Sequence, residues 1–257
     1  MKRIHKRSIE RIAIVDRGEA AVRLIRAIRE LNHEQHPAAL ATIAFFTELD
    51  HQAIFVREAD DAVCIGPAAF IDQRDGQRKS SYLNQGRIEE ALLTAQASAA
   101  WPGWGIQARH AWLAELCERL GITFIGPDAA ALRLLSDRNG VSQLAQQANI
   151  PVVPENARGI EGAHRLEVQV IADQYGTTRA IDVRYRTILH HNQKVLEESS
   201  SHLLPPEKER ELREAAIRLC QLAGYRNAAS VEFLYDPVQR LPLSQHGDAI
   251  AGKHLPD

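Results

Sequence analysis

Apolar and polar positions follow two different periods along the first 130 residues. Short apolar runs predict buried strands, and longer stretches with apolar residues three or four positions apart predict helices. The predicted strands are residues 11–15, 39–46, 62–65 and 122–125, and the predicted helices are residues 20–31, 86–100, 111–120 and one that begins near Ala129. The polar residues 72–81 are predicted to form a surface loop. Strands that alternate with helices favour a parallel sheet covered by helices.

The pattern changes beyond Pro151. Residues 166–172 and 179–184 flank a polar segment that ends in Gly176, which predicts an antiparallel hairpin with a glycine turn. Residues 207–222 have the period of an amphipathic helix, and residues 230–235 predict a further strand. The sequence therefore predicts an α/β protein: a Rossmann-like parallel-sheet domain over residues 1–153, a junction over 154–162 and an α+β domain over 163–257.

Composition narrows the class of protein. The chain has 257 residues, 45% hydrophobic and 25% charged, with a net charge of −2, which suits a packed core and argues against a protein built to bind nucleic acid. No apolar run is long enough to span a membrane. The basic start is not followed by an apolar signal core, and Cys64, Cys117 and Cys220 are too far apart in the sequence for a disulfide framework. We therefore expect a cytoplasmic protein.

General motifs for phosphate cradles and hydrolase triads are absent from the sequence. No G-x-G-x-x-G, G-x-x-x-x-G-K-[ST] or G-x-S-x-G motif occurs, and His33 and His36 lack the further ligands that a zinc site needs. Two segments leave alternatives open. Residues 101–105 (WPGWG) form either a packed structural turn or part of a site, and residues 190–198 (HHNQKVLEE) form either a solvated loop or an anion site around Lys194.

Eight segments in a fixed order carry a resemblance to a known family. They are Ile14–Ala20 (IVDRGEA), Ala62–Pro67 (AVCIGP), Ser81–Leu83 (SYL), Trp101–Gly105 (WPGWG), Phe124–Pro127 (FIGP), Leu166–Asp173 (LEVQVIAD), Asn192–Glu198 (NQKVLEE) and Val231–Leu234 (VEFL). Together they resemble the biotin carboxylase component of biotin-dependent acyl-CoA carboxylases. The two tryptophans and the Asn-Gln-Lys run are most similar to the branch found in large, multi-domain acyl-CoA carboxylases.

The resemblance implies a fold, a reaction and site residues. The fold is a Rossmann-like domain that precedes a partial ATP-grasp domain, and the reaction is that of an ATP-dependent ligase, the carboxylation of biotin with bicarbonate. By motif position, Lys194 is the catalytic candidate near phosphate or bicarbonate, Arg138 stands at a nucleotide-contacting lysine, and Glu232 is a Mg²⁺ carboxylate. The alternative for Glu232 is a strand carboxylate that faces solvent. The implied partners are a biotin carrier, a carboxyltransferase component and a second copy of the chain.

The chain departs from the family pattern at three places. Residues 155–159 stand where the family has its nucleotide-binding lid, and the family run R-D-C-x-x-Q-R-R-[HN]-Q-K reads Arg184-Tyr-Arg-Thr-Ile-Leu-His-His-Asn-Gln-Lys194. Residues 241–257 lack the second metal carboxylate and the family's catalytic run, which a frameshift in the gene would explain. Histidine does not replace arginine where charge is needed at neutral pH. We therefore expect a truncated relative that is catalytically impaired on its own.

Two other functions stay open at this stage. One is a non-catalytic interaction or regulatory relative of an acyl-CoA carboxylase, and the other is a Rossmann-like module that binds a different small ligand. Alternatively, the protein has the lid and only the recorded sequence lacks it. The nucleotide site would then keep its lid, but the run around Lys194 would still be altered.

Overall fold

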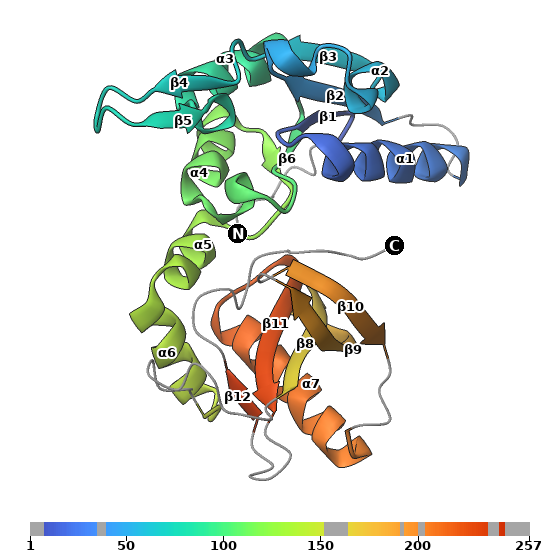
Figure 1. Ribbon diagram of the computed structural model, residues 1–257, viewed down its shortest axis with the longest axis vertical. Helices are drawn as coiled ribbons and strands as arrows, with labels where there is room; N and C mark the ends of the chain where they lie inside the picture. The colour runs from blue at the N-terminus through green and yellow to red at the C-terminus, as the bar shows by residue number, and fades with distance from the viewer. Residues whose placement is uncertain are drawn as a thin grey trace. The chain divides into compact units, whose positions relative to one another are not determined.

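The structure is a computed structural model, which describes residues 8–34, 40–151, 164–190, 193–199, 204–235 and 242–244. The chain divides into two compact units, residues 1–129 and 130–257, and each is described by itself (Figure 1). The predicted junction at residues 154–162 lies outside the described residues, so the predicted domain boundaries stay a prediction.

The first unit is built on a five-stranded, wholly parallel sheet. Its strands are β1 (Arg11–Ile14), β2 (Ala41–Phe46), β3 (Asp61–Cys64), β6 (Ala99–Trp101) and β7 (Thr123–Phe124), in the order β3-β2-β1-β6-β7. Because β1 is central, the chain winds outward from it in both directions. This topology confirms the predicted α/β class with a parallel sheet.

Helices cover both faces of this sheet. On β1, Ile14 packs with the long helix α1 (Gly18–Glu34) and with α2 (Ile54–Glu58), while Ala13 packs with α3 (Gln85–Thr94) and α4 (Ala111–Leu120). Successive side chains of a strand point to opposite faces, so an uninterrupted apolar run serves both layers.

Three short 3-10 helices and a small hairpin complete the first unit. They are η1 (Glu48–Asp50), η2 (Ser81–Leu83), η3 (Ile106–Arg109) and the antiparallel strands β4 (Ala69–Ile71) and β5 (Arg78–Ser80). Because β5 pairs with β4, the prediction of one continuous loop over residues 72–81 is wrong at its C-terminal end.

The predicted helix over residues 86–100 is also wrong in its second half. Helix α3 ends at Thr94, and Gln96 takes a left-handed backbone conformation with φ +48°. The chain then turns back, so the Ser98 N–H donates to the Arg11 carbonyl and residues 99–101 become β6 beside β1. Alanines dominate this segment, and alanine favours helix locally. Pairing with β1 overrides that preference.

The second unit combines three helices with an antiparallel sheet. The helices are α5 (Ala129–Ser136), α6 (Arg138–Gln147) and α7 (Pro206–Leu222). The strands are β8 (His164–Ala172), β9 (Thr178–His190), β10 (Gln193–Ser199), β11 (Asn227–Tyr235) and β12 (Pro242–Ser244), in the order β10-β9-β8-β11-β12. The predicted hairpin is confirmed: Asp173 accepts hydrogen bonds from the Tyr175 and Thr177 N–H groups, each at 2.8 Å.

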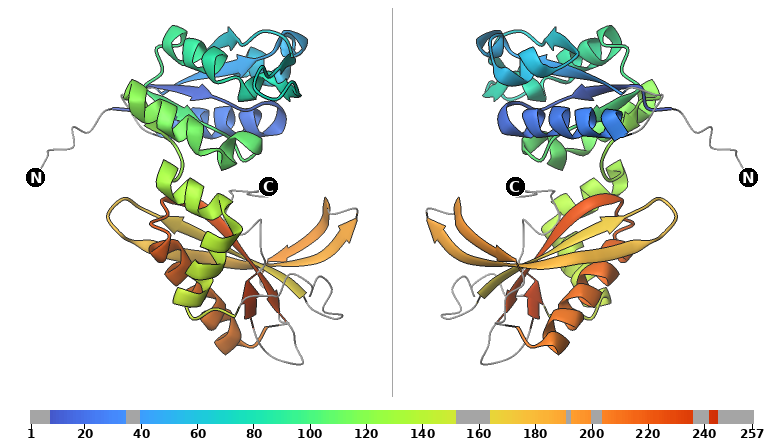
Figure 2. Two further views of the ribbon diagram at one scale, coloured as in Figure 1. Left: turned by 90° about the vertical axis from the view of Figure 1, so that its left-hand side faces the viewer. Right: turned by 90° about the vertical axis from the view of Figure 1, so that its right-hand side faces the viewer.

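Helices α6 and α7 pack on one face of this second sheet, and Figure 2 shows β9 and β10 extending together beyond the helices. The apolar face predicted for α7 is confirmed, since its residues Leu212, Ala215, Ala216 and Leu219 are buried in the core. The strands contribute every second residue to the same core, which leaves the intervening residues on the opposite face.

The structure also describes the surroundings of the three cysteines and the length and apolarity of the helices. Cys117 and Cys220 are buried free thiols, Cys64 is an exposed one, and burial raises the pKa of Cys117 to about 12. Over the part of the chain that the structure describes, no helix is both long and apolar enough to cross a membrane.

Candidate functional site

The second sheet carries a row of buried polar side chains on the face opposite its helices. Along β8, Leu166 and Val168 point into the helix-covered core, whereas Glu167 and Gln169 alternate with them and point the other way. Glu167 is nonetheless fully buried, with 0% of its surface exposed. A buried carboxylate is costly unless it is paired, so this face is a site candidate.

Strand register aligns the members of this row. Glu167 of β8 lies opposite Arg184 of β9 on one side and opposite Glu232 of β11 on the other, and Gln169 lies opposite Ser230. Directly opposed residues in antiparallel strands have Cβ atoms about 4.5–5.5 Å apart. We call Glu167, Gln169, Arg184, Ser230 and Glu232 the polar row; all five are buried.

Arg184 connects three other members of the row by hydrogen bonds. Its Nη2 donates to Oε1 of Glu167 at 3.1 Å, to Oε1 of Gln169 at 3.0 Å and to Oγ of Ser230 at 3.4 Å. Ser230 donates to Gln169 at 3.2 Å, and Gln169 in turn donates to the Ala229 carbonyl at 2.8 Å. The guanidinium is therefore held by neighbours that are themselves fixed.

The formal charges in the polar row do not cancel. Among these five side chains, Glu167 and Glu232 carry two negative charges and Arg184 carries one positive charge. Like charges directly opposite each other destabilise a sheet, so the two carboxylates need counter-charge; Arg184 supplies part of it, and Glu167 and Glu232 each make further polar interactions.

Mg²⁺ suits this donor set. It is held in nucleotide sites by one or two carboxylates together with substrate phosphates, not by a cage of protein ligands. The described residues contain no group of three or more His, Cys, Asp or Glu side chains that could hold a metal by themselves. Glu232 and Glu167 are the carboxylates that could contribute.

The structure places the three residues that the resemblance singled out as follows. Glu232 lies on β11 with 7% of its surface exposed, so the alternative of a carboxylate facing solvent is wrong. Lys194 lies on β10 in register with Leu189, and Arg138 is the first residue of α6. The side chains of Lys194 and Arg138 lie outside the described part of the chain, so their roles stay predictions.

The segment around Lys194 is regular structure. Residue 190 ends β9 and residues 193–199 form β10, so the alternative of a solvated loop over 190–198 is wrong for these residues. Residues 191–192 lie outside the described residues, as do residues 155–159, which are predicted to stand in place of the family's lid, and the tail from residue 245.

The first unit holds a second polar arrangement where its strands end. Asp16, directly after β1, accepts hydrogen bonds from the backbone N–H groups of Arg17, Trp104 and Gly105. Burial raises the pKa of Asp16, and these three hydrogen bonds oppose that rise. The Trp101 and Trp104 rings meet edge to face, with centroids 5.6 Å apart. These contacts confirm the packed structural turn.

An ion pair joins the segments that follow β1 and β2. Arg17 donates to Asp50 at 2.7 Å, and Asp50 also accepts from the Thr47 hydroxyl at 2.9 Å. Ligands of open α/β sheets bind where the strand order reverses, which here is between β1 and β6. Asp16 and its turn directly follow β1 and β6, the two strands on either side of that point.

Two family models match the chain. "Biotin carboxylase, N-terminal domain" matches residues 8–132, and "Carbamoyl-phosphate synthase L chain, ATP binding domain" matches residues 156–242. The first match covers the parallel-sheet unit, and the second covers the strands that carry the polar row together with helix α7.

Individual relatives agree with these models. Biotin carboxylase 1 of Bacillus subtilis (strain 168) is 31% identical over 89% of this chain and 62% of its own length, and the alpha chain of the mitochondrial propionyl-CoA carboxylase of Sus scrofa is 26% identical over 90% and 39%. The crystal structure of a Campylobacter jejuni biotin carboxylase–β,γ-ATP complex matches with a TM-score of 0.81 and 26% identity, over 96% of this chain and 66% of that one. The chain thus spans less than two thirds of the relatives it matches.

Proposed function

The chain belongs to the biotin carboxylase family, and from this we propose that its second unit binds Mg²⁺ and ATP at the polar row. The reaction of that family is the ATP-dependent carboxylation of biotin. One observation carries the proposal: Glu232 is buried in register with a second buried carboxylate, Glu167, on the sheet face opposite the helices.

The proposal assigns a task to each residue of this chain. Glu232 holds the metal, which when bound neutralises charge on the nucleotide phosphates. Lys194 and Arg138 are proposed to contact phosphate, and Lys194 is also the catalytic candidate. Cations and a paired carboxylate are what phosphoryl transfer needs, because catalysis there depends on positioning and electrostatic stabilisation.

We further propose that this chain alone turns over poorly. The family run that ends at Lys194 has lost its adjacent pair of arginines, and His190 and His191 stand in their places. A histidine at its ordinary pKa is mostly neutral at pH 7, so it supplies less positive charge to a phosphate or bicarbonate than arginine does. A non-catalytic relative that interacts with an acyl-CoA carboxylase is the second candidate, and it rests on the same substitutions.

The partners follow from the proposed reaction. We propose that biotin reaches the site attached to a carrier protein, which then delivers it to a carboxyltransferase component. A second copy of the chain is a further proposed partner. The relative from Sus scrofa is the alpha chain of a propionyl-CoA carboxylase, which supports a multi-component setting.

Titration calorimetry with Mg-ATP tests the binding step. We expect saturable heat with Mg-ATP and its loss when EDTA removes the metal. The absence of saturation at millimolar Mg-ATP would contradict the proposal. A coupled assay of ATP hydrolysis, with bicarbonate and free biotin added in turn, then separates the two candidates: stimulation by both substrates supports a slow carboxylase, and binding without any turnover supports the non-catalytic relative.

A further inference from the structure

Asn139 and Gly140 form the only Asn-Gly pair in the sequence, since every other asparagine precedes a residue that has a side chain. Asparagine is a thermolabile residue, and a following glycine leaves its side-chain amide accessible to the next backbone nitrogen, because glycine has no Cβ. Asn139 is exposed on the first turn of α6. The pair is therefore a candidate for spontaneous covalent change.

The structure explains why glycine occupies position 140. A Cβ atom added there would lie 2.7 Å from the carbonyl oxygen of Leu134 and 3.0 Å from its Cδ1. The first contact is too short for a carbon atom, and its partner is a backbone oxygen, which moves only if the helix moves. The close approach of α6 to the end of α5 thus requires glycine directly after Asn139, and it keeps the reactive pair in the chain.

Asp137 holds the amide hydrogens of this turn. As the N-cap of α6, it accepts from the Asn139 N–H through Oδ1 and from the Gly140 N–H through Oδ2, each at 3.2 Å. Its carbonyl also accepts from the Val141 N–H at 3.0 Å. An N-cap aspartate satisfies N–H groups that have no partner within the helix. The Gly140 nitrogen, which would be the attacking atom, is therefore engaged as a donor to a carboxylate.

We propose that Asn139 is a deamidation site and that the Asp137 carboxylate restrains its reaction. In the reaction, the Gly140 nitrogen loses its proton and bonds to Cγ of Asn139, while the bond from Cγ to Nδ2 breaks and ammonia leaves with that proton. Water then opens the resulting succinimide at either carbonyl, which gives aspartate or isoaspartate. The hydrogen bond to Asp137 holds the proton on Gly140, and the carboxylate repels the negative charge that develops when the proton leaves.

The two products differ in what they do to α6. Aspartate at position 139 adds a negative charge to the first turn, where the helix dipole favours it. Isoaspartate carries the main chain through its side chain, which adds a methylene to the backbone and separates the N–H groups that Asp137 holds. Isoaspartate should therefore loosen the start of α6, whose Leu144 packs in the core of the second unit. The inference does not depend on the proposed function.

The test follows deamidation of the full chain, without ligand, at mildly alkaline pH and physiological temperature. Isoelectric focusing detects the negative charge that is gained, and peptide mapping with pepsin at acidic pH locates it. We expect Asp137→Ala to deamidate at Asn139 about fivefold faster than wild type, because loss of an N-cap opens a helix end by about that factor. Asp137→Ser, which keeps a cap without the charge, should accelerate the reaction less. Equal rates in wild type and Asp137→Ala would overturn the inference.

Matched controls separate the cap from general loosening. Asp173 also accepts from two backbone N–H groups on an exposed turn of the same unit, so Asp173→Ala should leave the rate at Asn139 unchanged. A rise as large as that of Asp137→Ala would show that the cap has no special role. Asn149 and Asn227, which precede isoleucine and alanine, are internal standards in the same digest. Deamidation of either one as fast as that of Asn139 would refute the assignment of the site.

Unfolded wild-type protein provides a reference that needs no variant to fold. In guanidinium chloride the cap is absent, so we expect Asn139 to deamidate at least about tenfold faster than in the native protein. The same peptide map measures both rates. Equal rates in the two conditions would overturn the restraint, even if Asp137→Ala were unfolded as isolated.

Discussion

Gly103 lies directly against the carboxylate of Asp16: a Cβ atom on Gly103 would fall 1.6 Å from Oδ2 of that residue. Gly103 also has φ +68°, a conformation that side chains with a Cβ rarely adopt. Both facts follow from the same requirement, which is to bring the turn after β6 onto the buried carboxylate after β1.

Gly103→Ala should therefore destabilise the first unit strongly. Gly76 is a matched control, since it has the same φ of +68° with no atom within 4 Å of its added Cβ. We expect Gly76→Ala to cost about 1 kcal/mol from backbone strain, and Gly103→Ala to cost about 2–4 kcal/mol because the clash with Asp16 adds to it. Urea unfolding followed by tryptophan fluorescence measures both, and equal losses would contradict the close approach.

Asp16→Asn should change the pH dependence of stability. The pKa of Asp16 in the folded protein is raised above 3.8 by burial, so the folded state favours the protonated form. Wild-type stability should accordingly fall, relative to that of Asp16→Asn, as pH rises from about 3.8 through the raised pKa, and the difference should be constant above it. Free energies of unfolding for the two proteins across pH 4 to 7, from urea titrations, test this, and parallel profiles would refute it.

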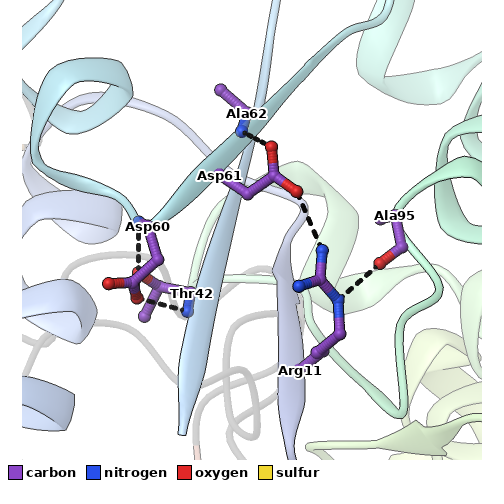
Figure 3. Close-up of polar contacts among 6 residues, drawn as sticks. All are labelled: Arg11, Thr42, Asp60, Asp61, Ala62 and Ala95. Atoms are coloured by element: carbon purple, nitrogen blue, oxygen red, sulfur yellow. Dashed lines mark hydrogen bonds and ion pairs between the residues drawn. The ribbon is translucent and has the colours of Figure 1, made fainter.

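Asp60, directly before β3, and Asp61, the first residue of β3, should contribute differently to the free energy of unfolding. Asp60 accepts from both the backbone N–H and the hydroxyl of the buried Thr42, each at 2.7 Å, whereas Asp61 pairs with Arg11 at 2.8 Å in a half-exposed position (Figure 3). Asp60→Ala should cost about 1–3 kcal/mol, because buried polar groups of Thr42 lose their acceptor. Asp61→Ala should cost less than about 1 kcal/mol. Denaturant midpoints in the reverse order would contradict this.

Glu232→Gln should weaken binding of Mg-ATP. We expect a loss of about tenfold or more in affinity, equivalent to about 1.4 kcal/mol, because the variant removes the proposed metal carboxylate. Glu211→Gln is the control on the same unit, since Glu211 pairs with Lys208 on the surface of α7. Calorimetric titration of both variants is the measurement, and an unchanged affinity for Glu232→Gln would remove Glu232 from the site.

Much of the fold could be predicted because local pattern and tertiary environment agree. The apolar runs of β1 and β2, and the spacing of α4 and α7, give the same element in isolation and in the structure. Strand β6 could not be found this way. Its alanines continue the composition of α3, Gln96 provides no glycine signal at the turn, and only pairing with the distant β1 makes these residues a strand.

The site was predictable only in part. A motif indicates Glu232 as a candidate, but Glu167 and Arg184 occupy alternate positions of strands, where charged residues ordinarily face water. Their place in the polar row depends on the register between strands, because Arg184 is 17 residues from Glu167 and 46 from Ser230 in the sequence. A polar residue at every second position on three neighbouring strands is the signal that would have identified the row.

The central place of β1 also affects how the first unit can form during synthesis. Ile12 pairs with Ala99, and that contact does not exist until residues 99–101 have left the ribosome. Until then β1 has only β2 beside it, on a sheet whose other half is still missing. The hairpin of β8 and β9 needs only its own turn. Loop closure over a long segment slows folding. The pairing of β1 with β6 should therefore form late, although β1 is the first of these strands to be synthesised.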